Sequence, residues 1–187
     1  MLRTNHFFLS FIENLHEKQA NIEELSLKTF PKGTFLLKQD GRSSKVFIIK
    51  EGITKCFFSE ENGKDYIVEF LSEGEILGEI EAIRNNNCLC SVETLTDVEA
   101  YAINIPFFKQ LLEKDLNFQK LLLDELAERL INTSSRASSQ QLYTIEYGLK
   151  KILELQYKQN IVISKEDMAA YLGITLRSLN RALTNLK

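Results

Sequence analysis

The chain has 187 residues, 44% hydrophobic and 26% charged, which is an ordinary globular composition with room for one large domain or two small ones. Its net charge of −3 excludes a protein that binds nucleic acid through a uniformly basic surface, and no apolar run is long enough to cross a membrane. Three cysteines do not make a disulfide framework, so we expect a cytoplasmic protein.

The first two dozen residues predict a surface helix. Phe8, Phe11, Ile12 and Leu15 share one side of it. The short apolar run lacks a small-residue cleavage site, which argues against a signal peptide.

Residues 30–104 predict a set of short strands. The β-rich runs are separated by turn residues, and Asn62-Gly63 between two of them is a strong hairpin signal. No strand alternates with a helix, so a parallel sheet is disfavoured. The runs therefore predict an antiparallel barrel or double-sheet roll. They read TFLLK, VFIIK, ITKCFF, DYIVEF, CSVETL and VEAYAIN.

Residues 107–157 predict helix with one interruption. Apolar or small residues recur there at spacings of three and four, as in the seam between two paired helices. An amphipathic helix lying on its own domain would show a similar pattern, so both interpretations stay open. The polar stretch TSSRASSQQ, of low helix propensity, predicts a hinge before a further helix near 143–157.

The last 25 residues predict two short helices joined by a tight turn. Ser164 and Thr175 suit helix N-caps, and Gly173 suits the left-handed position that ends a helix. On the second helix one face is apolar, and Arg177 and Arg181 lie roughly opposite it. Such a helix fits the DNA major groove, where an arginine can bind guanine with two hydrogen bonds. The apolar face consists of Leu179, Ala182, Leu183 and Leu186.

The charge distribution agrees weakly with this interpretation. Residues 143–187 hold seven Lys/Arg and four Asp/Glu, a local net charge of +3, which leaves −6 for the remainder. A basic end on an acidic body is typical of a DNA-contacting segment attached to a sensor domain.

The whole arrangement resembles the Crp/Fnr family of bacterial transcription regulators. Residues 31–83, PKGTFLL through GEIEAI, resemble the family's cyclic-nucleotide-binding-type β-roll. The segment ERLINTSS resembles the distal half of its dimer helix, and the final segment resembles its DNA-binding motif. The resemblance implies an α+β chain with three parts: a β-roll sensor over 1–116, a dimerisation helix and hinge over 117–141, and a helix-turn-helix domain over 142–187.

The resemblance also implies partners and contact residues. They are a second copy of the chain, double-stranded DNA and RNA polymerase. Thr175 and Ser178 would touch phosphates, Arg177 and Arg181 would face bases, and Leu176 stands where the cyclic AMP receptor branch has an arginine. The dimer interface would be formed by Leu123, Leu126, Leu130 and Ala137. Family members usually continue with a two-stranded wing, which we expect this chain to lack.

The effector pocket is the least certain correspondence. In the receptor branch, a Gly-Glu turn, an Arg-Ser pair and a Thr-Ser pair on the dimer helix hold the cyclic nucleotide. Gly78-Glu79 and Thr133-Ser134 match two of these, but Cys88-Leu89 or a close neighbour stands in place of the Arg-Ser pair. Without that guanidinium a phosphate is poorly compensated, so we expect no cyclic nucleotide cofactor and an empty or repurposed pocket.

Two alternatives remain. Cys88 and Cys90 would share one face of a strand, which allows a thiol-responsive regulator, although buried structural cysteines are common. The other alternative is a ligand-binding module without a DNA function in this shortened form. No catalytic constellation and no metal-ligand spacing is present in the sequence, so we expect neither an enzyme nor a metal site.

Overall fold

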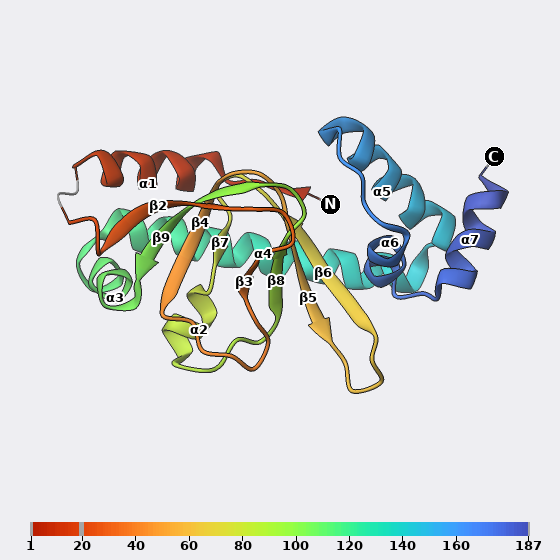
Figure 1. The fold of residues 1–187 in the computed structure, drawn as a ribbon, viewed down its shortest axis with the longest axis horizontal. Coiled ribbons are helices and arrows are strands. Elements are labelled where there is room, and N and C mark those ends of the chain that lie inside the picture. Colours follow the sequence, from red (N-terminus) through yellow and green to blue (C-terminus); the bar gives the residue numbers. More distant parts are fainter. Residues whose placement is uncertain (1, 19–20, 187) are drawn as a thin grey trace.

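The computed structural model describes residues 2–18 and 21–186. Two β-sheets form a roll, and a long helix runs from the roll to three C-terminal helices (Figure 1). The architecture is the predicted α+β roll followed by a helical domain. Among the described residues, no helix combines the length and apolar character needed to cross a membrane.

The first sheet has five strands in the order β1-β6-β5-β8-β3, and the second has four in the order β2-β9-β4-β7. All neighbouring strands run antiparallel except β1, which pairs parallel to β6. The strands are β1 Leu2–Arg3, β2 Leu25–Phe30, β3 Phe35–Leu37, β4 Lys45–Glu51, β5 Thr54–Ser59, β6 Asp65–Leu71, β7 Ile76–Leu77, β8 Ser91–Thr94 and β9 Val98–Asn104.

Seven helices are present in the described residues. They are α1 His6–Lys18, α2 Glu79–Arg84, α3 Ile105–Lys114, α4 Leu116–Leu142, α5 Ile145–Gln159, α6 Lys165–Leu172 and α7 Leu176–Asn185. Phe8 and Ile12 of α1 are fully buried, as their spacing predicts. The predicted hairpin at Asn62-Gly63 joins β5 to β6, and Gly63 has a φ of 73°.

Three apolar clusters hold these elements together. The first packs α1, α3 and the start of α4 against the four-stranded sheet, and includes Phe108 and Phe118. The second fills the space between the two sheets, with Ile49 and Val92. The third packs α5, α6 and α7 against Phe57, Ile67 and Phe70 of the five-stranded sheet. The C-terminal helices therefore share a core with the roll.

The polar stretch at residues 133–141, where a hinge was predicted, is helical in this structure. Helix α4 continues through the polar stretch to Leu142 and ends at Tyr143. The low helix propensity of this stretch is offset by contacts with the rest of the protein. Arg136 donates to the carbonyl oxygens of Ile67 and Tyr171 at 2.7 and 2.6 Å. The Tyr66 hydroxyl also donates to the Gln140 side chain at 2.9 Å.

Candidate nucleic-acid interface and effector pocket

The turn between α6 and α7 is built from short-range hydrogen bonds. The Ser164 hydroxyl accepts the amide of Asp167 at 2.9 Å, and the Thr175 hydroxyl accepts that of Ser178 at 3.2 Å. Gly173 has a φ of 68°, the left-handed conformation expected of a helix C-cap. All three positions were predicted from the sequence, and together they fix where α7 begins.

Helix α7 has a buried apolar face and an exposed basic one. Leu179 is fully buried and Ala182 nearly so, whereas Arg177 and Arg181 are exposed. The helix contains no acidic residue, and within the described part of the chain neither arginine takes part in an ion pair. Both guanidinium groups are therefore available to an outside partner. Thr175 and Leu176 are also exposed, and Ser178 is half-buried.

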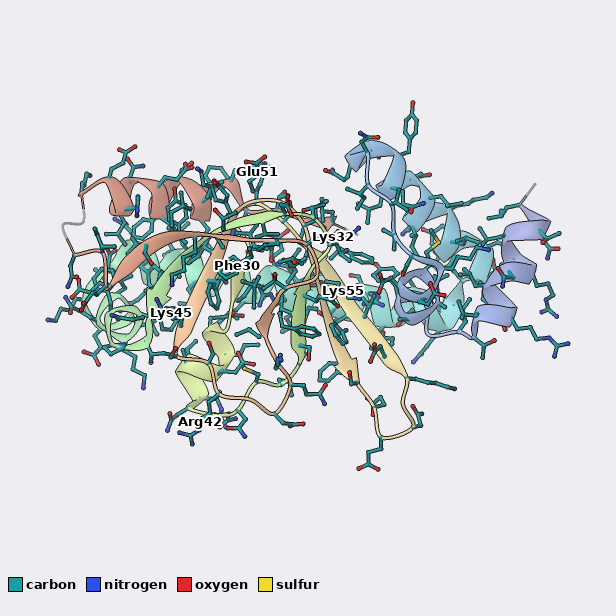
Figure 2. All side chains as sticks on the ribbon, viewed as in Figure 1. Phe30, Lys32, Arg42, Lys45, Glu51 and Lys55 are labelled. Carbon is teal, nitrogen blue, oxygen red and sulfur yellow. The ribbon has the colours of Figure 1, made fainter. Side chains whose placement is uncertain are left out.

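Helix α6 is fixed on the roll by polar and aromatic contacts. Lys55, labelled in Figure 2, lies 2.7 Å from Asp167 of α6 and 3.1 Å from Glu93 of β8. Burial lowers the pKa of Lys55, but the two carboxylates more than offset it, so the pKa is raised and the amine stays charged. Tyr171 stacks on Phe70 with ring centroids 5.1 Å apart. The direction of α7 is thus tied to the roll.

One face of α4 presents apolar side chains spaced seven residues apart. Leu116, Leu123 and Leu130 are 78%, 66% and 69% exposed, and Ala137 is exposed as well. A seven-residue spacing keeps side chains on one side of a helix, as in paired helices. Leu126, expected in the same seam, is half-buried and packs on the core beside α1 and α3. The exposed seam therefore consists of Leu116, Leu123, Leu130 and Ala137.

The residues expected around an effector lie in two different environments. Gly78 caps α2 with a φ of 85°, and Glu79 is 1% exposed inside the roll. Thr133 and Ser134 are exposed on α4, and in the described residues no hydrogen bond joins them to Glu79. The Glu79 carboxylate is held instead by the guanidinium of Arg129.

Arg129 belongs to a buried cluster of charged side chains that the sequence analysis missed. Its Nη2 lies 3.3 Å from Glu75 and 3.4 Å from Glu125. Arg3 of β1 approaches the cluster from the other side, 3.3 Å from Glu75 and also paired with Glu125. The cluster, completed by Glu69 and Glu79, joins β1, the roll and α4, and it holds four carboxylates against two guanidinium groups.

The excess of negative charge in the cluster contributes to raised pKa values at three of its side chains. Burial raises the pKa of Glu75 to about 7, with help from Glu125 and against the two arginines. Burial also raises the pKa of Glu79, although Arg129 opposes the shift. The pKa of Arg129 is raised because the surrounding carboxylates outweigh its burial. The cluster is therefore sensitive to charge brought into the roll.

A pattern in α4 would have revealed part of this cluster. Phe118, Leu122, Glu125 and Arg129 follow one another at spacings of four, three and four, so they share one helix face. Phe118 and Leu122 are buried, which places the two charged residues on the buried side. Arg3 carried no such signal, because its partners lie far away in the chain.

The segment that stands in place of the family's Arg-Ser pair is bound by a carboxylate. Glu81 of α2 is 9% exposed, and its side chain accepts the amide of Leu89 at 2.9 Å. Arg84, the nearest arginine in sequence, is exposed. A second anion at this place would meet Glu79 and Glu81 without a free guanidinium, which is electrostatically unfavourable.

A well-defined cavity lies elsewhere. It has a volume of about 480 Å³ and sits between β1, the distal half of α4 and helices α5 and α6. Arg3, Glu75, Arg136 and Tyr147 line it, whereas Gly78 and Glu79 do not. The cavity therefore borders the charged cluster from the side of the C-terminal helices.

The comparisons with known proteins agree with this architecture. The cyclic nucleotide-binding domain family matches residues 27–115. The cAMP-activated global transcriptional regulator CRP of Salmonella typhimurium is 21% identical over 169 residues, which cover 84% of this chain and 80% of that protein. Over most of its length the chain is therefore similar to a transcription regulator of the Crp/Fnr type.

Solved Crp/Fnr structures share the fold over nearly the whole chain. The c-di-GMP responsive global regulator CLP of Xanthomonas campestris superposes with a TM-score of 0.77 at 15% identity, covering 97% of this chain and 91% of that one. A Crp/Fnr regulator from Eubacterium rectale gives 0.77 at 14% identity, covering 97% and 83%. These relatives are transcription regulators rather than enzymes, in agreement with the prediction that this chain is not an enzyme.

The cysteines are arranged differently from the expected pair. Cys88 is buried, and Cys90 lies beside Cys56 of β5, with the two sulfur atoms 2.8 Å apart. Cys88 and Cys90 both precede β8, so they do not share a strand face. The shared strand face on which the thiol-responsive alternative was based is therefore wrong. In the described residues, no group of three or more His, Cys, Asp or Glu is arranged to hold a metal ion.

Proposed function

We propose that the protein is a homodimeric, cytoplasmic regulator of transcription that reads double-stranded DNA with α7 and acts on RNA polymerase. The observation that carries the proposal is the form of α7, whose leucine face is buried against α5 and α6 while Arg177 and Arg181 are exposed and unpaired in the described structure. An arginine fork binds the O6 and N7 atoms of guanine in the major groove.

The contacts divide by the position of each residue on α7. Thr175 and Ser178 stand at the N-terminal end of the helix, where backbone amides favour phosphate groups. Arg177 and Arg181 are one helical turn apart and would face base edges. Leu176, immediately before Arg177, is exposed and offers an apolar contact to a thymine methyl group.

The second copy would pair through α4. Exposed apolar side chains at four successive heptad positions are costly to leave in water, and a symmetric partner would cover them. The two α7 helices of such a dimer would meet half-sites about one turn of DNA apart, roughly 34 Å. The domain limits then follow as a roll over 1–116, a dimer helix over 117–141 and a DNA-reading domain over 142–187.

Control by an effector would act on the boundary between the roll and α4. Gly78 and Glu79 lie on the roll side of this boundary, and Thr133 and Ser134 lie on α4 one turn beyond Arg129. An effector that competes for the Arg129–Glu79 ion pair would shift α4 against the roll. Arg136 would transmit this movement to the C-terminal helices, because it donates hydrogen bonds to both β6 and α6. We do not assign a cyclic nucleotide, because Glu81 already takes the amide of Leu89.

The test is DNA selection followed by binding measurements. A preferred site is selected from a random duplex library, and its affinity is measured by fluorescence anisotropy at increasing salt. We expect affinity to fall steeply with salt, and Arg177→Ala and Arg181→Ala to cost about 1–3 kcal/mol each and relax base preference. Arg84→Ala, an exposed arginine on α2, is the matched control and should change nothing.

Dimerisation is tested separately. Leu123→Asp and Leu130→Asp should give monomers in light scattering after gel filtration, while Leu142→Asp on the same helix should not. If the chain selects no DNA sequence and shows no salt-dependent binding, the ligand-binding module is the better description. If it is monomeric with the native seam, the pairing through α4 is wrong.

A further inference from the structure

The two half-buried cysteines of the roll face each other across neighbouring strands. Cys56 lies on β5, and Cys90 comes immediately before β8, which pairs with β5. Their sulfur atoms are 2.8 Å apart, and both thiols are free. Cys56 packs against the apolar cluster between the sheets, so the pair lies in the interior of the roll.

The strand pairing places the two cysteines diagonally across from each other. Cys56 is directly opposite Val92, and Phe57 is opposite Ser91, so Cys90 comes one position beyond the last paired residue. Diagonal side chains on paired strands are close enough to touch, and here the two sulfur atoms are in contact. A disulfide bond is about 2.05 Å long, so the two sulfur atoms need to approach by less than about 1 Å.

We propose that Cys56 and Cys90 are a disulfide-forming pair that is oxidised by peroxides. Neither the family assignment nor the expected effector pocket calls for this modification. Its formation does not depend on the proposed DNA-binding function, because it is defined by the chemistry of two thiols.

The two thiols have different roles because their environments differ. A hydrogen bond with Cys90 and burial raise the pKa of the Cys56 thiol well above its ordinary value, so this thiol remains protonated. Cys90 lies next to Leu89, whose side chain is 57% exposed, at the surface end of the pair. Cys90 is therefore the sulfur that a peroxide reaches first, and Cys56 is the one that resolves the product.

The reaction balances in two steps. The Cys90 sulfur attacks one peroxide oxygen and breaks the O–O bond, giving a sulfenic acid at Cys90, while the other oxygen leaves as water with the thiol proton. The Cys56 sulfur then attacks the Cys90 sulfur and breaks the S–O bond, and the hydroxyl leaves as a second water with the Cys56 proton. One hydrogen peroxide is reduced to two waters, and the two thiols lose two hydrogen atoms.

The position of the pair explains why its oxidation would reach beyond the two strands. Cys56 is paired in register with Glu69 of β6, and Glu69 lies 3.5 Å from Arg3 in the charged cluster. The charge of Arg129 also acts on the Cys56 thiol. A change in the spacing between β5 and β8 would therefore move charged side chains of the cluster that joins the roll to α4.

The experiment measures the mass of the oxidised full-length chain. The reduced protein is treated with hydrogen peroxide, quenched, unfolded and labelled with N-ethylmaleimide, and its peptides are mapped. The reduced chain should take up three labels, one for each cysteine. The oxidised chain should take up one label, at Cys88, be two hydrogen atoms lighter before labelling, and yield a linked Cys56–Cys90 peptide.

Three variants separate this pair from the other possibilities. Cys88→Ser is the matched control and should still form the disulfide, whereas Cys56→Ser and Cys90→Ser should not. Cys56→Ser should leave a sulfenic acid at Cys90 that a cyclic 1,3-dione traps. The proposal is wrong if the linked peptide contains Cys88, if it joins two chains, or if Cys88→Ser abolishes it. Three labelled thiols after peroxide treatment that over-oxidises an exposed model thiol would also overturn it.

Discussion

Replacing Glu75 by Gln should flatten the pH dependence of folding stability. The Glu75 side chain is 1% exposed and lies 3.3 Å from both Arg3 and Arg129. Glu125 shares these arginines, and burial together with its charge raises the pKa of Glu75 from 4.5 to about 7. The glutamine side chain keeps the shape of the glutamate and an oxygen that accepts from the arginines, but it does not titrate.

The sign and size of the effect follow from the raised pKa. Between pH 4.5 and about 7 the folded protein holds a proton on Glu75 that the unfolded chain has released. The stabilisation from Glu75 is therefore fully present below pH 4.5 and is lost as the pH rises through about 7. One pKa unit corresponds to about 1.4 kcal/mol, so the wild type should lose about 3 kcal/mol of unfolding free energy from this group.

The assay is urea unfolding between about pH 4.5 and 8. The protein concentration is fixed because the stability of the proposed dimer would depend on it. The difference between the wild-type and Glu75→Gln profiles isolates this carboxyl group from Glu79, which titrates in the same direction. Glu61→Gln, an exposed carboxylate on the β5–β6 hairpin, is the control and should leave the slope unchanged. Parallel profiles for the wild type and Glu75→Gln would refute the reasoning.

Two further predictions concern packing, and both are measured by chemical unfolding. Gly74→Ala should destabilise the protein by on the order of 3 kcal/mol, because its φ is +81° and the new Cβ would lie 1.8 Å from the Asn5 carbonyl oxygen. Gly63→Ala has a φ of +73° and open space, so it should cost only about 1–2 kcal/mol, and equal costs would contradict the role given to the contact. Leu149→Ala, at a fully buried position in α5, should cost about 2–5 kcal/mol, whereas Leu142→Ala at an exposed position should stay within about 0.5 kcal/mol.

The elements that the sequence predicts are those with a regular period or a strong cap. The helix-turn-helix could be placed almost to the residue, because Ser164, Gly173 and Thr175 mark its ends and the leucines of α7 repeat every three or four positions. Strands with alternating or continuous apolar residues could also be predicted from the sequence. Strand β2 was missed because only Leu25 is buried in it and half of its side chains are exposed.

The parts that could not be predicted depend on long-range contacts. Helix α4 runs through a polar stretch because β6 and α6 bind Arg136 and Gln140, and these partners are distant in sequence. The charged cluster was not predicted from the sequence for the same reason. The proximity of Cys56 to Cys90, which are 34 positions apart, was not predicted either. A one-dimensional pattern shows which face of a helix or strand is buried, but it does not show which buried faces meet.

The pairing of Arg3 with Glu125 sets an order for assembly on the ribosome. The two residues are 122 positions apart, and β1 adds to the edge of a sheet whose other strands all follow it in the chain. At about 5–20 residues per second, the start of the chain waits on the order of ten seconds before its partner is synthesised. Strand β6, Glu69 and Glu75 are synthesised earlier, so β1 can pair with the sheet before Glu125 exists. The charged cluster is complete only after α4 has emerged.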